Sequence, residues 1–281
     1  MSVDRVVYTS SGIKITSAKS ATGGIDLQTV QNATFTVNIP RENVNTLGAE
    51  GTVFRPQLDA PDASIEFNIV PATSGSPKWG PTEADAYINN ALAGDPTGDQ
   101  ATVEALGIGK VESALMNSLS CEATVGAMAN MTISFTGSPS TAAPPSTLSS
   151  PGSPTSLSLV ESKDVTVANV GKFESACAQS ASVAWDLPVV NVLCLGGDPA
   201  DPSKVYPFGN PPGTASMTIE GLDDALRWNA ATSDYTLTIG VFDFELKGGF
   251  IDSQTNSVAV GDVFATFNYV IGGTADSFTI N

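Results

Sequence analysis

Several short stretches of this chain alternate apolar and polar residues one by one. In the clearest stretch Phe35, Val37 and Ile39 alternate with polar residues, the pattern of a β-strand that has one face in a core and the other facing solvent or a partner. Similar alternation occurs at 183–187, 65–69, 131–135, 217–219, 237–241 and 267–271. Because these stretches are short and turn residues separate them, they predict a mainly β, antiparallel fold.

Two segments have helical spacing instead. Residues 82–92 begin with Thr82 and Asp85 at the spacing of a capping box, followed by apolar residues on one face. Residues 222–229 place Leu222, Leu226 and Trp228 on one side in the same way. We expect each helix to cover an open end of a β-sandwich.

One long segment of the chain occurs twice. Residues 23–48 recur without a gap 148 positions later, with eight identities in 26 aligned positions, among them Pro40 with Pro188. Further on, the tripeptides at 116–118 and 251–253 precede a Val-Gly step and a last strand in both halves. Self-similarity at a fixed offset sets the architecture, and here it predicts two copies of one building block.

The two copies are separated by a segment that cannot form a core. From Gly137 to Ser156 the chain consists almost wholly of Ser, Thr, Pro, Gly and Ala, which is typical of a tether. The sequence therefore predicts two tandem antiparallel β-sandwich or barrel modules, 1–137 and 157–281, each with a short flanking α-helix, joined by a linker at 138–156.

Composition narrows the class of protein. The 281 residues are 41% hydrophobic, which is enough for two cores of ordinary size. We expect no membrane segment and no signal peptide, because no stretch approaches about 20 apolar residues and the first 20 residues lack an apolar block. The three cysteines lack C-x-x-C spacing, which favours small buried side chains over redox or metal chemistry.

Charge and the lack of histidine exclude further classes. The net charge is −17 and there is no histidine. A protein that grips nucleic acid has a basic surface for the phosphates, so an acidic chain serves DNA only by repelling it. The commonest general base and the commonest metal ligand are both missing.

Two acidic turns are candidate calcium loops. Asp95 and Asp99 flank one turn, and Asp198 and Asp201 flank the other. Neither turn has the spacing of an EF-hand loop, and Asp, Gly and Pro together satisfy the backbone needs of a turn. We therefore expect no metal site.

Catalytic patterns are equally weak. Asp243 and Glu245 alternate with Phe242 and Phe244 and superficially resemble the carboxylate pair of a glycosidase. A polar strand face between aromatic residues is more typical of an interface. No nucleophile with a base and no phosphate-binding glycine loop is found, so the sequence predicts no enzyme and no cofactor.

The segment 35–48, a strand leading through a polar loop to Leu-Gly, followed by the β segment at 65–70, resembles the first half of the tail tube proteins of long-tailed bacteriophages. The segment 114–135 is similar to the last pair of strands in that family, and 251–271 has the same layout.

This resemblance implies β-sandwiches with a flanking helix that assemble into stacked rings of six modules around a DNA channel. A duplicated chain would then form a homotrimer with pseudo-hexameric symmetry in the virion tail, assembled in the host cytoplasm. About four strands per module would give an inner wall of about 24 strands and about 50 Å diameter. The implied partners are the tape measure, tail-tip and tail-terminator proteins, and duplex DNA that passes through without specific binding.

Within such a ring, particular residues receive expected roles. Acidic side chains on polar strand faces, namely Glu66, Glu122, Asp243 and Glu245, are candidates for the channel wall, since an acidic wall repels DNA and keeps it centred. The long loop from Pro40 to Gly51 and its counterpart from Pro188 to Pro199 are expected to reach another subunit or ring. The residues assigned to that contact are Arg41, Glu42, Asn43, Arg55 and Asn191.

An alternative function class is a two-domain β-sandwich binding protein, such as an adhesin, a lectin or a virion decoration protein. The Ser/Pro tether and acidic loops suit it equally, but the expected lack of a signal peptide and the odd number of cysteines weaken a secreted adhesin. A hydrolase on a β scaffold is a third class, for which the sequence offers no polar cluster.

Overall fold

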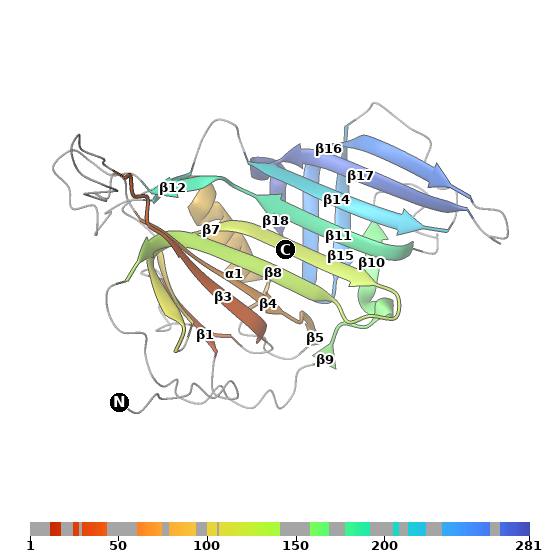
Figure 1. The fold of residues 1–281 in the computed structure, drawn as a ribbon. Coiled ribbons are helices and arrows are strands. Elements are labelled where there is room, and N and C mark those ends of the chain that lie inside the picture. The colour runs from red at the N-terminus through yellow and green to blue at the C-terminus, as the bar shows by residue number, and fades with distance from the viewer. Residues whose placement is uncertain are drawn as a thin grey trace.

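The computed structural model describes thirteen stretches of the chain: 12–17, 25–27, 30–43, 61–74, 79–93, 100–105, 107–140, 158–168, 178–191, 205–207, 213–222, 232–258 and 265–281. These residues form a mainly β fold with one α-helix, as the alternating pattern predicts (Figure 1).

The strands, in chain order, are β1 (Ile13–Ser17), β2 (Ile25–Asp26), β3 (Val30–Asn38), β4 (Asp62–Ile69), β5 (Ala72–Ser74), β6 (Ala101–Ala105), β7 (Gly109–Thr124), β8 (Asn130–Pro139), β9 (Ser158–Leu159), β10 (Val165–Ala168), β11 (Ala178–Asp186), β12 (Val189–Asn191), β13 (Val205–Pro207), β14 (Thr214–Gly221), β15 (Ser233–Ile239), β16 (Phe242–Ser257), β17 (Thr266–Thr274) and β18 (Phe278–Ile280). The helix α1 spans Pro81–Ala93, and short 3-10 turns lie at Ser162–Asp164 and Ala275–Ser277.

The predicted strands at 34–39, 65–69, 131–135, 183–187, 217–219, 237–241 and 267–271 correspond to β3, β4, β8, β11, β14, β15 and β17. Three of the predictions run too far, because β3 ends at Asn38, β11 at Asp186 and β15 at Ile239, and residues 240–241 form a turn. The helix predicted at 82–92 is α1, which begins with Pro81 at its first position, where a missing N–H costs nothing. Its buried face consists of Ala84, Tyr87, Ile88 and Ala91. Most of the second predicted helix, from residue 223 onward, lies outside the described residues.

Strand pairing follows the same order in both halves of the chain. In the first half the antiparallel order is β1-β6-β7-β8-β4-β3, and in the second half it is β10-β15-β16-β17-β14-β11. The β-bulges recur as well. A bulge at Val30/Asn32 of β3 has its counterpart at Ala178/Ser180 of β11, again 148 residues later.

The two halves share one sheet. Strand β11 pairs with β14 on one side and with β7 on the other, and this second pairing connects the halves into a single 14-stranded antiparallel sheet. Strand β8 continues to Pro139, two residues past the end predicted for the first module, and residues 141–157, which hold most of the predicted linker, lie outside the described residues.

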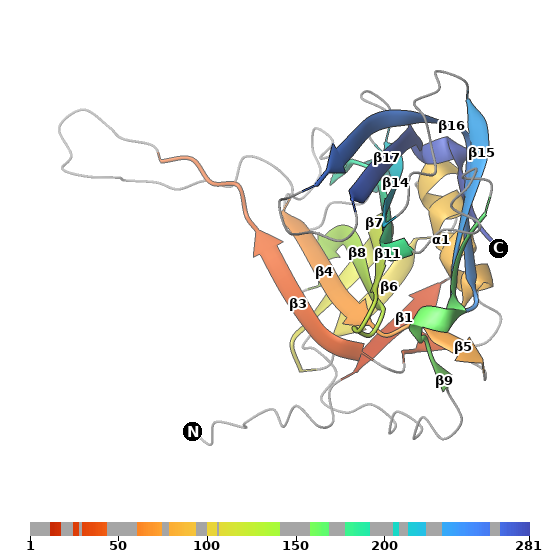
Figure 2. The same ribbon diagram turned by 90° about the vertical axis from the view of Figure 1, so that its right-hand side faces the viewer.

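Eight strand segments lie side by side in the broad part of this sheet, which we call the front wall (Figure 1). Their order is β16 (residues 250–257), β17, β14, β11, β7 (residues 115–124), β8, β4 and β3. Both β7 and β16 are 16 residues long. The first half of β7 pairs with β6 as well as with β8, and the first half of β16 pairs with β15. These pairings lead into a back layer that also holds β10 and β18, with α1 on the same side of the front wall (Figure 2).

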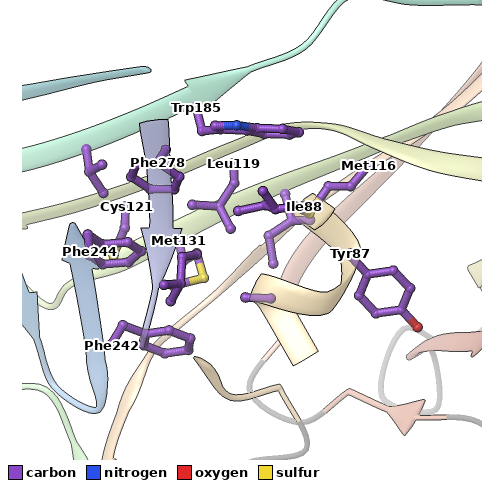
Figure 3. Close-up of a cluster of buried hydrophobic side chains, with 14 of the residues drawn as sticks. Tyr87, Ile88, Met116, Leu119, Cys121, Met131, Trp185, Phe242, Phe244 and Phe278 are labelled. Carbon is purple, nitrogen blue, oxygen red and sulfur yellow. The ribbon is translucent and has the colours of Figure 1, made fainter. Parts of the chain in front are cut away.

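One hydrophobic core fills the space behind the front wall. Figure 3 shows side chains of the second half, Phe242, Phe244, Phe278 and Trp185, in the same cluster as Leu119, Cys121 and Met131 of the first half. The backbone N–H of Ile280 in β18 also lies 3.5 Å from the Asp85 carboxylate of α1. The two halves therefore share core packing as well as a sheet.

Candidate functional site

The two halves are connected by the pairing of β7 with β11, which we call the closed joint. Its side that faces the core is apolar. On its inner side Leu119 of β7 faces Trp185 of β11, and Cys121 faces Val183. All four side chains are buried, and the Trp185 Nε1–H donates to the Ala275 carbonyl at 3.1 Å. The joint therefore combines a backbone ladder with a desolvated core contact, which makes it part of the folded interior.

Each end of the front wall has an open margin. Within the described residues β3 pairs only with β4, and residues 250–257 of β16 pair only with β17. We call these the β3 margin and the β16 margin. Unpaired strand edges of this kind readily accept a further strand.

The two margins are counterparts of the two strands in the joint. Strand β3 corresponds to β11 through the repeated segment and the repeated bulge. The bulge between Met116 and Ser118 of β7 recurs between Ile251 and Ser253 of β16, so the second half of β16 corresponds to the second half of β7. The chain therefore carries a pair of open strands that match its own closed pair.

Burial at the margins differs from burial in the joint. Val37 of β3 is 39% exposed, whereas its counterpart Trp185 is 1% exposed. Phe250 at the β16 margin is 45% exposed, whereas its counterpart Leu115 is 3% exposed. Ile39 and Val258 are also exposed at the margins. Exposed apolar side chains thus gather at both margins. Their counterparts at the closed joint are buried.

The side of the front wall that faces away from the core is polar, and we call it the front face. Its side chains on β7 and β11, such as Ser120 and Ser182, point opposite to the buried set. Six carboxylates lie on this face: Asp62, Glu66, Glu122, Asp186, Glu220 and Asp252, the last of which lies over Gly272. The eight described strand segments of the front wall contain no Lys and no Arg.

The structure separates the four acids that the sequence groups together. Glu66 of β4 and Glu122 of β7 lie on the front face and are exposed. Asp243 and Glu245 lie in the first half of β16, which pairs with β15 and β18 in the back layer. There Asp243 accepts a hydrogen bond from Thr238 (2.6 Å) and Glu245 one from Thr279 (3.3 Å).

The segment after β3 projects from the body of the molecule (Figure 2). Arg41, Glu42 and Asn43 are exposed in it. In the second half the corresponding segment holds β12, in which Asn191 pairs with Val205 of β13. Strands β12 and β13 contact β7 and β8 of the first half. Arg55, the fifth residue assigned to this contact, lies outside the described residues.

The described residues hold no group of three or more metal-ligating side chains. The acidic turns around Asp95 and Asp198 lie outside them. Burial raises the pKa of the Cys121 thiol well above its ordinary value, so this thiol stays protonated at neutral pH. Burial and the nearby Glu83 carboxylate raise the pKa of Tyr87 to about 12. Both side chains act as core residues.

Two features of the front wall were not identified from the sequence. The pairing of β7 with β11 joins residues far apart in the chain, and no local pattern indicates it. The absence of Lys and Arg from all eight strand segments can be read directly from the sequence, once it is known which segments lie together.

The scan of protein families yields no model that matches this chain, and the search of curated proteins yields no matching sequence. Within the described residues, no helix combines the length and the apolar composition that crossing a membrane requires.

Proposed function

We propose that this chain is the ring-forming subunit of a bacteriophage tail tube, and that it consists of two copies of one tube module. Three chains would form a ring of six modules, and stacked rings would enclose a channel for double-stranded DNA. The proposal implies no catalytic activity and no cofactor.

The observation that carries the proposal is that β7 and β11 pair within the chain, whereas the strands that correspond to them, β16 and β3, each have an open edge. A β3 margin that pairs with the β16 margin of another chain repeats the internal joint. Such a contact is heterologous, and a heterologous contact that closes on itself produces a ring. Eight front-wall segments per chain would supply the inner wall of about 24 strands that the family resemblance implies.

The front face supports the assignment of the channel wall. Six carboxylates and no cation in its described strands give a surface that repels phosphates over its whole width. Ser, Thr and Asn provide most of the remaining side chains, and the one exposed aromatic ring among the described front-face residues is Phe250 at the β16 margin, so no row of rings is present on which successive bases could stack. DNA would therefore pass along this wall without being held.

The segment around Arg41 supports a contact between chains. Its counterpart in the second half, β12 and β13, already contacts β7 and β8 across the internal joint. By the same arrangement Arg41, Glu42 and Asn43 would contact β16 and β17 of the next chain. The proposal also implies contacts with a tape measure protein and, at the two ends of the tube, with tip and terminator proteins.

Electron microscopy of the purified protein at increasing concentration tests the proposal. Hollow rings or tubes with three-fold symmetry and six similar lobes in end-on views are the expected result. Isolated two-lobed particles at every concentration, including in the presence of tail tips, would refute it and favour a binding or virion decoration protein.

A further inference from the structure

The joint that would form between chains has a different chemical character from the joint within the chain. Counting from the matching bulges, the buried Leu119 and Cys121 of β7 correspond to Gln254 and Asn256 of β16. Two apolar side chains on the inner side of the closed joint are thus replaced by two amides at the open margin.

These amides already interact with each other. The Gln254 Nε2–H donates to the Asn256 Oδ1 at 3.1 Å and to the Tyr269 hydroxyl at 3.3 Å. Asn256 is exposed and Gln254 is half-buried, so both retain contact with water in the free chain. Covering them with a second strand would remove that water, and a buried amide without full hydrogen bonding is costly.

We propose that β3 of one chain pairs with residues 253–257 of β16 in the next chain in one defined register, and that Gln254 and Asn256 make this joint reversible. The proposal rests on the proposed ring and names the contact that builds it. In this register Thr36 lies opposite Thr255, and Val37 and Phe35 lie opposite Gln254 and Asn256.

The register follows from the closed joint. There Ala184 lies opposite Ser120, and these residues correspond to Thr36 and Thr255. Beyond the two ends of the joint the Val125 amide donates to the Gln179 carbonyl (2.9 Å) and the Leu187 amide to the Asn117 carbonyl (2.8 Å). These bonds make the pairs on the front face the non-hydrogen-bonded kind, whose Cα atoms are about 4.5 Å apart.

The reversibility follows from the contrast between apolar and amide side chains. The closed joint holds inside one chain, where it buries Trp185 and Val183 against Leu119 and Cys121. In the joint between chains, the β3 margin would offer Val37 and Phe35 for the same contact. The β16 margin of the next chain would present the amides of Gln254 and Asn256 to them. A free chain therefore gains little from pairing at one margin alone, and a stable joint requires further contacts in the growing ring.

The register is tested by oxidation of the double variant T36C/T255C. Disulfide-linked dimers and trimers are expected, with no larger species from a closed ring. The variant T36C/S253C, displaced by two residues on the same face, should cross-link poorly because such positions are about 7–8 Å apart. Each single-cysteine variant controls for the natural thiols, and A184C/S120C should form the matching bond inside the chain. Equal cross-linking in the displaced variant would overturn the register.

The reversibility is tested with the double variant Q254L/N256V, which makes the margin apolar like the closed joint. The concentration at which assembly begins should fall by about tenfold or more. The matched control is T132V, which adds an apolar side chain to the front face of β8, away from both margins, and should leave the onset unchanged.

An unchanged onset in Q254L/N256V would overturn the role of the amides while leaving the ring intact. If no variant and no natural chain assembles at any concentration, the proposed ring fails, and the joint fails with it. Tubes that form normally but do not cross-link through T36C/T255C would refute this joint alone.

Discussion

At the scale of single residues, equivalent positions in the two halves differ in burial because they have different neighbours. Val37 and Trp185 occupy the same place in the repeated segment, and the alternating pattern correctly predicts that both belong to strands. It does not predict that Trp185 is covered and Val37 is open, since that depends on whether a further strand lies alongside.

This difference predicts opposite effects of matched substitutions. Trp185→Ala removes a buried side chain and its hydrogen bond to Ala275, so the free energy of unfolding of the free chain should fall by about 3–5 kcal/mol. Val37→Ala removes a largely exposed side chain and should change it by less than about 1 kcal/mol, but should raise the onset concentration of assembly. Chemical denaturation and light scattering measure the two quantities. A strongly destabilised V37A chain would contradict the exposure described for the β3 margin.

At the scale of elements, alternation predicted β3, β4, β8, β11, β14, β15 and β17, and helical spacing predicted α1, because each of these has its own periodicity. The 16-residue strands β7 and β16 were harder to recognise, since bulges interrupt their alternation at Met116/Ser118 and Ile251/Ser253. The sequence did place a tripeptide at the same point of both halves, before a Val-Gly step. The structure explains why these two places correspond: each marks the second half of a long strand, where it enters the front wall.

The projecting segment after β3 gives a prediction at this scale. Arg41→Glu should weaken assembly at least severalfold without changing the stability of the free chain. The reason is that Arg41, one of the few cations of the chain, would contact the neighbouring chain, which is acidic. Sedimentation at several salt concentrations measures the effect. Lys163→Glu, which reverses an exposed charge in the 3-10 turn before β10, is the control. Unchanged assembly of the Arg41 variant would contradict a contact between chains here.

At the scale of the whole molecule, the sequence predicted two repeated units but not the single sheet that connects them. The pairing of β7 with β11 brings together segments about 60 residues apart, and strand partners at such distances leave no local signature. The separation of the four acids has the same origin. Asp243 and Glu245 alternate along a strand just as Glu66 does, but their half of β16 lies in the back layer.

This separation allows a matched test of the channel wall. The double variant E66K/E122K places two cations on the front face and should slow DNA delivery from assembled particles while rings and tubes still form. The double variant D243K/E245K makes the same change of charge in the back layer and should leave delivery unchanged. Electron microscopy measures assembly, and the rate of DNA release measures delivery. Equal slowing by both variants would exclude the front face as the channel wall.

The joint between β7 and β11 has one more consequence, which concerns mass action. In a ring of six modules, half of the strand joints would be closed within single chains before any collision, and their formation would not depend on concentration. Only three chains would lose translational and rotational freedom when the ring closes, whereas a ring built from six separate modules would require six to do so. The amount of closed ring would then rise with the third power of the free chain concentration rather than the sixth.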